Sequence, residues 1–244
     1  MSVSDEDSKP SVGLYSESMR HANPRRATLR VLAPVMLAAT LLGPFASYAA
    51  DTDLGPNARL VNFARTGDVD GVHRLLAQGA SPDARNRLGE TALVIALKRN
   101  DTTLANAMLE AGTDVNVASA NGTTALMAAA YAGQAEVVQA LLARGADPAA
   151  TDRIGKNAIT YAAGQGHAEV VRALLGHGVD PNARYRNDLT ALMWAAGYGR
   201  DEAVKVLLAA GARTDLRDNR GKTAADIARE AGYPETSKLL QEKP

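Results

Sequence analysis

The apolar positions of this sequence recur with a fixed period of 33 residues from residue 54 onward. Apolar pairs stand at Leu75-Leu76, Met108-Leu109, Leu141-Leu142, Leu174-Leu175 and Leu207-Leu208. Glycines follow the pairs at Gly79, Gly112, Gly145, Gly178 and Gly211, and a polar residue recurs at Thr91, Thr124, Asn157, Thr190 and Thr223. A self-similar period of this length is typical of a repeat protein in which each unit stacks on its neighbours.

One unit of the pattern predicts two short helices. Thr124 is placed to cap a helix that begins at Ala125 and ends at Gly133, where a left-handed residue terminates it. A second helix over residues 135–143 has apolar pairs four residues apart, so it presents one apolar stripe. Gly145 ends this helix, and the Asp-Pro pair that follows directs the chain into a turn. Because one such unit cannot bury both its faces, stacking of units must supply the stability.

Composition supports helices and excludes some chemistry. Only 4% of the residues are aromatic, and alanine and leucine supply most of the apolar content, which favours close-packed helices over a sheet. The sequence has no cysteine, which excludes disulfides, thiolate metal sites and cysteine nucleophiles. The formal net charge is +0, so the whole chain offers no argument for nucleic acid or for an anionic membrane surface.

The repeat resembles the ankyrin repeat, whose units of about 33 residues open with Thr-Pro-Leu-His. The resemblance covers residues 54–240 and implies an all-α solenoid of five to six helix-turn-helix units with protruding β-turn loops. The units are predicted at residues 54–85, 87–118, 120–151, 153–184, 186–217 and 219–241. Alanine replaces the family's proline at Ala92, Ala125, Ala158, Ala191 and Ala224. The histidine position holds Val94, Met127, Thr160, Met193 and Asp226, so the hydrogen bond usually made there is expected to be absent or altered.

The terminal units are expected to cap the array. Residues 60–79 fit the two-helix pattern without a threonine opening, and residues 224–240 have Pro234 early in the second helix and a polar end. Polar outer faces of this kind keep the ends of a solenoid soluble.

Residues 1–49 are predicted to be an N-terminal extension and signal peptide preceding a repeat domain at 50–244. Four arginines between residues 20 and 30 precede the apolar stretch 31–45, and Ser47 and Ala49 suit cleavage after Ala49. Met19 offers a start that gives a leader of ordinary length. An uncleaved anchor is the alternative, since residues 31–50 approach the roughly 20 residues that span a bilayer. Pro34, Gly43 and Pro44 favour cleavage, so export to the periplasm or beyond is expected.

The sequence gives no support for catalysis. His73, His167 and His177 do not form the spacing of a metal site, and they are interpreted as structural or surface residues. The glycine-rich segments 164–166 and 197–199 are turns between helices with no strand before them, so they do not predict a phosphate-binding loop. No enzyme activity, cofactor, metal or small-molecule substrate is therefore expected.

The resemblance implies that partners are bound by the protruding turns and by the exposed ends of the first helices, on the concave side. The predicted partner-binding residues are Arg87, Lys98, Arg99, Tyr131, Arg153, Lys156, Arg184, Arg186, Tyr198, Arg217, Arg220 and Lys222. Arg65 and Arg85 fall on the same side, and Glu90 and Glu230 are the acids there. Exposed tyrosines at such positions are typical binding hot spots, whereas Tyr161 and Trp194 are expected to pack between units.

Cleavage after Ala49 would leave 22 basic and 23 acidic residues, so a nearly neutral protein is predicted to gather positive charge on one side. We expect a monomeric periplasmic adaptor or accessory protein that grips the acidic surface of a protein partner. The alternatives are an anionic envelope component, such as a lipid headgroup or wall polymer, and a solvated basic face without function. Nucleic acid is disfavoured by export, and membrane attachment is expected only if the leader is uncleaved.

Overall fold

The computed structural model describes residues 54–242. Within this range the chain forms twelve α-helices and one short 3-10 turn, and no strand is present apart from an isolated bridge between Arg85 and Thr91. The predicted signal peptide and its cleavage site after Ala49 lie outside the described residues.

The helices alternate between two positions in each unit. The first helices are α2 (Pro56–Thr66), α4 (Ala92–Lys98), α6 (Ala125–Ala132), α8 (Ala158–Gln165), α10 (Ala191–Gly197) and α12 (Ala224–Glu230). The second helices are α3 (Val69–Ala77), α5 (Thr102–Glu110), α7 (Ala135–Ala143), α9 (Ala168–Gly176), α11 (Asp201–Ala209) and α13 (Pro234–Leu239). The 3-10 turn η1 (Arg186–Asp188) lies between α9 and α10. The helix limits predicted for residues 125–143 are confirmed.

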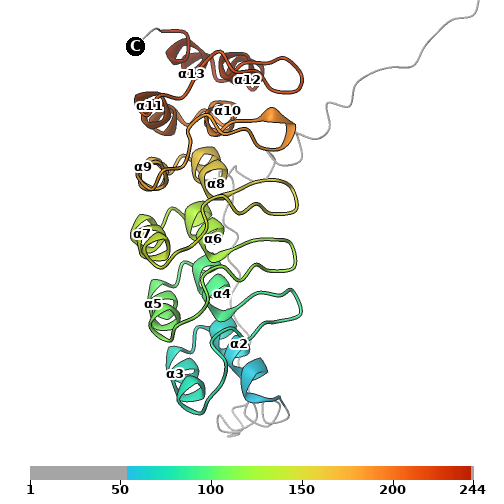
Figure 1. The fold of residues 1–244 in the computed structure, drawn as a ribbon, viewed down its shortest axis with the longest axis vertical. Helices are drawn as coiled ribbons and strands as arrows, with labels where there is room; N and C mark the ends of the chain where they lie inside the picture. The colour runs from blue at the N-terminus through green and yellow to red at the C-terminus, as the bar shows by residue number, and fades with distance from the viewer. Residues whose placement is uncertain (1–53, 243–244) are drawn as a thin grey trace, which may run out of the picture. The chain divides into compact units, whose positions relative to one another are not determined.

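The units stack so that first helices form one column and second helices form another (Figure 1). Each first helix contacts the first helices of the units before and after it. The loops that join one unit to the next all project to the same side of the array (Figure 1). We call these loops fingers, at residues 79–91, 112–124, 145–157, 178–190 and 211–223.

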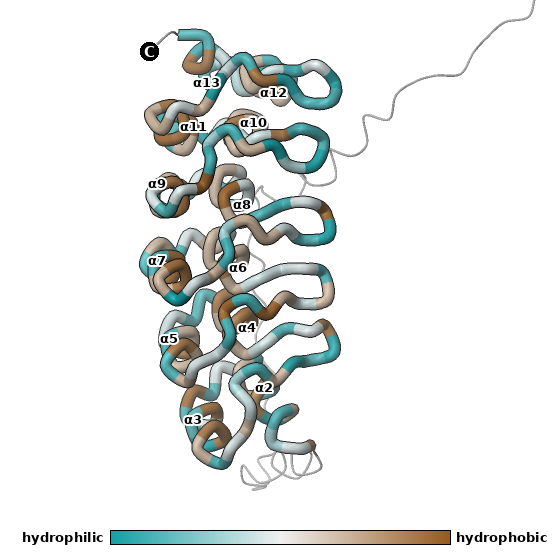
Figure 2. The backbone as a smooth tube through the Cα atoms, viewed as in Figure 1, coloured by the Kyte–Doolittle hydropathy of each residue, from teal (hydrophilic) through white to brown (hydrophobic). Residues whose placement is uncertain are grey.

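The core runs continuously through the stack because the same register is small and apolar in every unit. One position of the first helix is a fully buried alanine in five successive units, at Ala96, Ala129, Ala162, Ala195 and Ala228. Alanine lets neighbouring helices approach closely, and larger side chains such as Leu141 and Leu174 of the second helices fill the space between the columns. Figure 2 shows hydrophobic residues concentrated on the helices and hydrophilic residues on the fingers.

The predicted helix caps are present. The side chains of Thr91, Thr124, Asn157, Thr190 and Thr223 each accept a hydrogen bond from the backbone N–H three residues later. The hydrogen bond usually made by the family's histidine is expected to be absent or altered, and in two units other polar side chains at that position replace it in part. Thr160 and Asp226 bond back to the backbone N–H of Asn157 and Thr223, which completes a capping box in two units.

Three first helices, α4, α6 and α8, also contact a side chain of the next unit through a carbonyl oxygen near their C-terminal end. His167 Nε2 lies 3.0 Å from the carbonyl oxygen of Tyr131, and Arg200 Nε donates to the carbonyl oxygen of Gly164 at 3.1 Å. These contacts satisfy carbonyl groups that a helix leaves unpaired at its C-terminal end. The structural role predicted for His167 is therefore confirmed.

No helix within residues 54–242 combines the length and the apolar character needed to cross a membrane.

Candidate functional site

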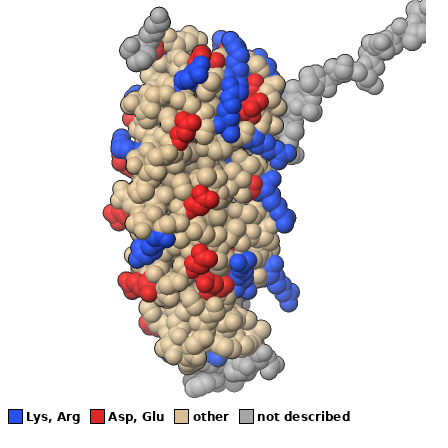
Figure 3. Space-filling model, viewed as in Figure 1, with Lys and Arg blue, Asp and Glu red and all other residues tan. Residues whose placement is uncertain are grey.

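The predicted partner-binding residues lie on one side of the array, which we call the finger face. It consists of the fingers and the exposed C-terminal ends of the first helices. Eight of the predicted residues are on fingers: Arg87, Arg153, Lys156, Arg184, Arg186, Arg217, Arg220 and Lys222. The other four lie at or just beyond the ends of first helices: Lys98, Arg99, Tyr131 and Tyr198. Figure 3 shows lysine and arginine gathered along the edge from which the fingers project.

Both acids predicted on this face are neutralised by lysines of the chain itself. Lys98 Nζ lies 2.6 Å from Glu90 Oε1 in one unit, and Lys222 pairs with Glu230 in the last unit. The side chain of Glu90 is only 15% exposed. Burial alone would raise the pKa of Glu90, but hydrogen bonds from Lys98 and Asn86 outweigh it and hold the pKa below its ordinary value.

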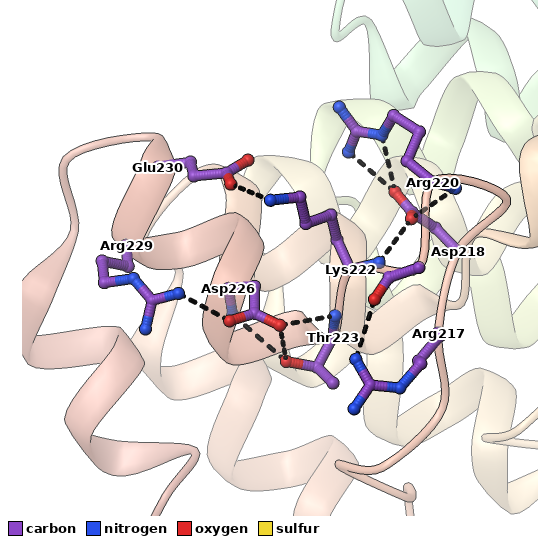
Figure 4. A network of polar contacts seen from close by, with 9 residues as sticks. Arg217, Asp218, Arg220, Lys222, Thr223, Asp226, Arg229 and Glu230 are labelled. Carbon is purple, nitrogen blue, oxygen red and sulfur yellow. Dashed lines mark hydrogen bonds and ion pairs between the residues drawn. The ribbon is translucent and has the colours of Figure 1, made fainter.

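The last finger is held by a network of charged side chains (Figure 4). The side chain of Asp218 is 1% exposed and accepts hydrogen bonds from the backbone N–H groups of Arg220 and Lys222 and from the Arg220 guanidinium. Burial opposes ionisation of Asp218, yet these donors lower its pKa below the ordinary value. Arg217 donates to the carbonyl oxygen of Gly221. Arg220, Lys222 and Arg217 therefore contribute to the structure of this finger.

The remaining cations fall into two groups. Arg184 forms a longer ion pair with Asp188 at 3.8 Å, so four of the predicted cations have carboxylate partners within the chain. Five others have no carboxylate within 4.0 Å in the described part of the chain: Arg87, Arg99, Arg153, Lys156 and Arg186. The same holds for Arg217, which donates to a backbone carbonyl instead. The unpaired positive charge therefore lies mainly on the fingers in the first half and the middle of the array.

The half-buried Lys156 lies at the centre of an aromatic row. Its Nζ is 4.0 Å from the centroid of the Trp194 ring and 5.4 Å from that of Tyr161. Trp194 stacks on Tyr198 at 6.2 Å between centroids, and Tyr161 meets Tyr131 edge to face at 5.8 Å. Desolvation lowers the pKa of Lys156, and the nearby Asp152 carboxylate opposes that shift.

Asp152 fixes the finger beside this row. Its side chain is buried and accepts hydrogen bonds from the backbone N–H groups of Ile154 and Lys156. The Tyr161 hydroxyl donates to the second carboxylate oxygen, and burial together with this acceptor raises the pKa of Tyr161 far above its ordinary value. Lys156 and Tyr161 are thus positioned by one buried carboxylate.

The structure corrects the sequence interpretation of the aromatic residues. Tyr131 is 55% exposed, as predicted. Tyr198, also predicted to be exposed, is half-buried because it stacks on Trp194. Tyr161 and Trp194 pack partly between units, yet both rings face the Lys156 ammonium on the finger face. Comparing the same repeat position in successive units could have shown that these two rings lie side by side. That position holds Tyr161 and Trp194 in consecutive units, and Ile95 and Ala128 in earlier ones.

The fingers around Lys156 differ from the others in how they are joined. Backbone hydrogen bonds link finger tips at Leu88–Ala120, Asn121–Arg153 and Asn187–Asn219. Within residues 54–242 the corresponding bond between Ile154 and Arg186 is missing, and the stem of Arg186 instead lies against Gly155. Ile154 is 53% exposed at this step. The finger that carries Lys156 is therefore not tied by its backbone tip to the following finger in the described part of the chain.

Among the described residues, no group of histidine, aspartate and glutamate side chains is arranged to hold a metal ion.

Comparisons with known proteins agree with the geometry. The sequence model described as ankyrin repeats (3 copies) matches residues 60–152 and 159–244. The crystal structure of EF0377, an ankyrin repeat protein, is similar to this chain with a TM-score of 0.68 and 31% sequence identity, over 76% of this chain and 98% of that one. A comparison with curated protein sequences gives no match.

Proposed function

Because the chain belongs to the ankyrin-repeat family, we propose that it binds the acidic surface of a protein partner through its finger face. Ankyrin repeats are generally non-enzymatic modules for protein–protein interaction. Beyond this general role, we propose that the partner's surface is acidic and that the finger face is the surface that binds it.

The distribution of unpaired charge supports this proposal. Glu90 and Glu230, the two acids among the predicted contact positions, are paired with lysines, whereas six of the ten predicted cations have no carboxylate within 4.0 Å among the described residues. A surface whose contact positions carry an excess of one sign of charge attracts a partner of the opposite sign and accelerates its association. The aromatic row adds apolar area of the kind that dominates binding free energy at interfaces.

The place of action is proposed from the leader pattern. Arginines followed by an apolar stretch and small residues before Asp51 suit an exported protein, so we propose a monomeric periplasmic adaptor or accessory role. An anionic lipid headgroup or wall polymer could meet the same cations. Such a ligand would contact the charges along all fingers and would need no aromatic row.

Affinity capture from an envelope extract tests the proposal. One bait is the unmodified protein, and a second has Arg87, Arg153 and Arg186 changed to glutamate. These three side chains are exposed on different fingers. A matched control changes Arg74, Arg144 and Arg172 to glutamate, since these exposed arginines lie at second helices away from the fingers.

The proposal predicts a defined protein that the unmodified bait and the control retain and the finger variant loses. Equal retention by all three baits would contradict it. Retention of lipid or wall polymer without a protein, graded with salt concentration, would favour the envelope-component alternative.

A further inference from the structure

Two positions of the repeat, eight residues apart, form an ion pair in two units of this chain. The first position precedes the helix cap, and the second lies at the end of the first helix. Glu90 and Lys98 occupy them in one unit, and Lys222 and Glu230 occupy them in the last unit, with the charges exchanged. The backbone of the unit therefore brings these two side chains together whichever of them is acidic.

The same two positions in the unit of α8 hold Lys156 and Gly164, so this unit has the cation but not the acid. Gly164 is buried within α8, and a Cβ atom placed there would lie 3.6 Å from the Tyr198 ring and 4.0 Å from Trp194. These are ordinary van der Waals distances. The missing side chain thus leaves space that is bounded by two aromatic rings.

Lys156 is held in place without using its hydrogen-bond donors. Its Nζ makes no hydrogen bond or ion pair within residues 54–242, and it faces the Trp194 and Tyr161 rings instead. The rings attract the charge of an ammonium group, but its three N–H donors prefer oxygen acceptors. A carboxylate that reached Lys156 would form charge-assisted hydrogen bonds, which are about twice as strong as neutral ones.

We infer that Lys156 is the subsite for one carboxylate of the partner, an aspartate or glutamate side chain on a protein segment that lies across α8 and α10. The partner's acid takes the place relative to Lys156 that Glu230 takes relative to Lys222 in the last unit. This inference rests on the proposed protein-binding function and deepens it by naming the residue and the group that it binds.

The surroundings favour a protein segment over a phosphate polymer. One ammonium faces Trp194 and Tyr161, and these rings contact Tyr198 and the exposed Tyr131. Such a setting suits an acidic side chain next to an apolar one. At this step the tips of the two fingers are not joined by a backbone hydrogen bond between Ile154 and Arg186 within residues 54–242, so the backbone groups there are not paired with each other.

The test supplies the missing acid within the chain. Gly164→Glu restores the Lys–Glu pair of the other units and should block the subsite, while Gly164→Gln adds a side chain of the same size without charge. Both replace a helical glycine by a better helix former and should fold. Lys156→Met removes the cation and keeps the apolar stem. Circular dichroism and thermal unfolding of the full-length protein establish that each variant is folded.

Trp194 is the single tryptophan of the sequence, so its fluorescence reports on the subsite. Acetylated, amidated hexaglutamate is titrated at low ionic strength, with hexaglutamine and phosphatidylglycerol vesicles as other probes. We expect a saturable response to hexaglutamate alone, weakened at least about tenfold by Gly164→Glu and by Lys156→Met. Gly164→Gln should weaken it less than about threefold, because a neutral amide leaves the Lys156 charge unpaired.

Two results would overturn the inference. One is no response to hexaglutamate, whether or not the vesicles give a response that Gly164→Glu abolishes. The other is equal weakening by Gly164→Gln and Gly164→Glu. The capture experiment separates this inference from the proposed function. A partner lost by the finger variant but retained by Gly164→Glu would overturn the subsite and leave the acidic-partner proposal in place.

Discussion

The ammonium of Lys156 lies 4.0 Å from the centroid of the Trp194 ring, across the boundary between two consecutive units. The contact joins a finger of one unit to the first helix of the next. It therefore couples the charged fingers to the helical column, and it places a desolvated cation beside the aromatic row.

A double-mutant cycle measures this coupling. Lys156→Met, Trp194→Leu and the combined variant are compared by urea unfolding. A cation close to a tryptophan face contributes roughly 0.5–2 kcal/mol, so the coupling free energy should fall in that range. A coupling indistinguishable from zero would mean that the two side chains are neighbours without a stabilising interaction.

The inter-unit contact of His167 predicts different costs for two glycine substitutions. Gly112 and Gly133 both have positive φ, but a Cβ at Gly112 would meet nothing within 4 Å, whereas one at Gly133 would lie 2.6 Å from the His167 ring. Gly112→Ala should cost about 1–2 kcal/mol for its left-handed backbone. Gly133→Ala should cost at least about 1 kcal/mol more, because the ring must move and its hydrogen bond is lost.

Unfolding free energies from urea titrations check this difference. Adding His167→Ala to Gly133→Ala should remove most of the extra cost. Equal destabilisation by the two glycine variants would contradict the packing of His167 on Gly133.

The side-chain caps of the first helices are expected to contribute to the stability of the protein. Thr124→Ala should lower the unfolding free energy by about 1 kcal/mol, because the backbone N–H of Met127 loses its acceptor at the start of α6. Thr124→Ser keeps the hydroxyl and should cost much less. A cost that is the same for both variants would assign the role of Thr124 to its methyl group instead.

The acid dependence of stability follows from Glu90 and Asp218, whose pKa values are lowered from 4.5 and 3.8 in the folded protein. A carboxyl group whose pKa is lower in the folded protein than in the unfolded chain stabilises the fold. This stabilisation is fully present at a pH above the pKa of the unfolded chain, and it is lost as the pH falls through the pKa of the folded protein. The melting temperature should therefore fall as the pH is lowered below about 4.5. Asp218→Asn should make the fall shallower, and an unchanged pH profile in this variant would contradict the network of the last finger.

The sequence predicts the array well because every unit repeats the same local signals. Thr124 and Gly133 limit α6 by backbone rules that need no tertiary information, and the period places each unit on the next. The exposed cations on finger tips, such as Arg87 and Arg153, follow from the same register.

The Lys156 environment could not be predicted in the same way. Whether a cation is paired depends on the side chain eight residues away, and here that residue is Gly164 instead of an acid. The Trp194 ring reaches Lys156 from the following unit, so the contact appears only when two units are stacked. The exposure predicted for Tyr198 is wrong for a different reason, since its ring stacks on that of Trp194 four residues earlier in the same unit.

Binding of an acidic protein surface by the finger face is what we propose for this protein above all. The most direct measurement is the affinity of the captured partner for the unmodified protein and for the variant with Arg87, Arg153 and Arg186 changed to glutamate, each at low and high salt. We expect the affinity of the unmodified protein to fall as salt is raised and the variant to bind far more weakly at both concentrations. Equal, salt-independent affinities would contradict this proposal and would place the binding surface away from the fingers.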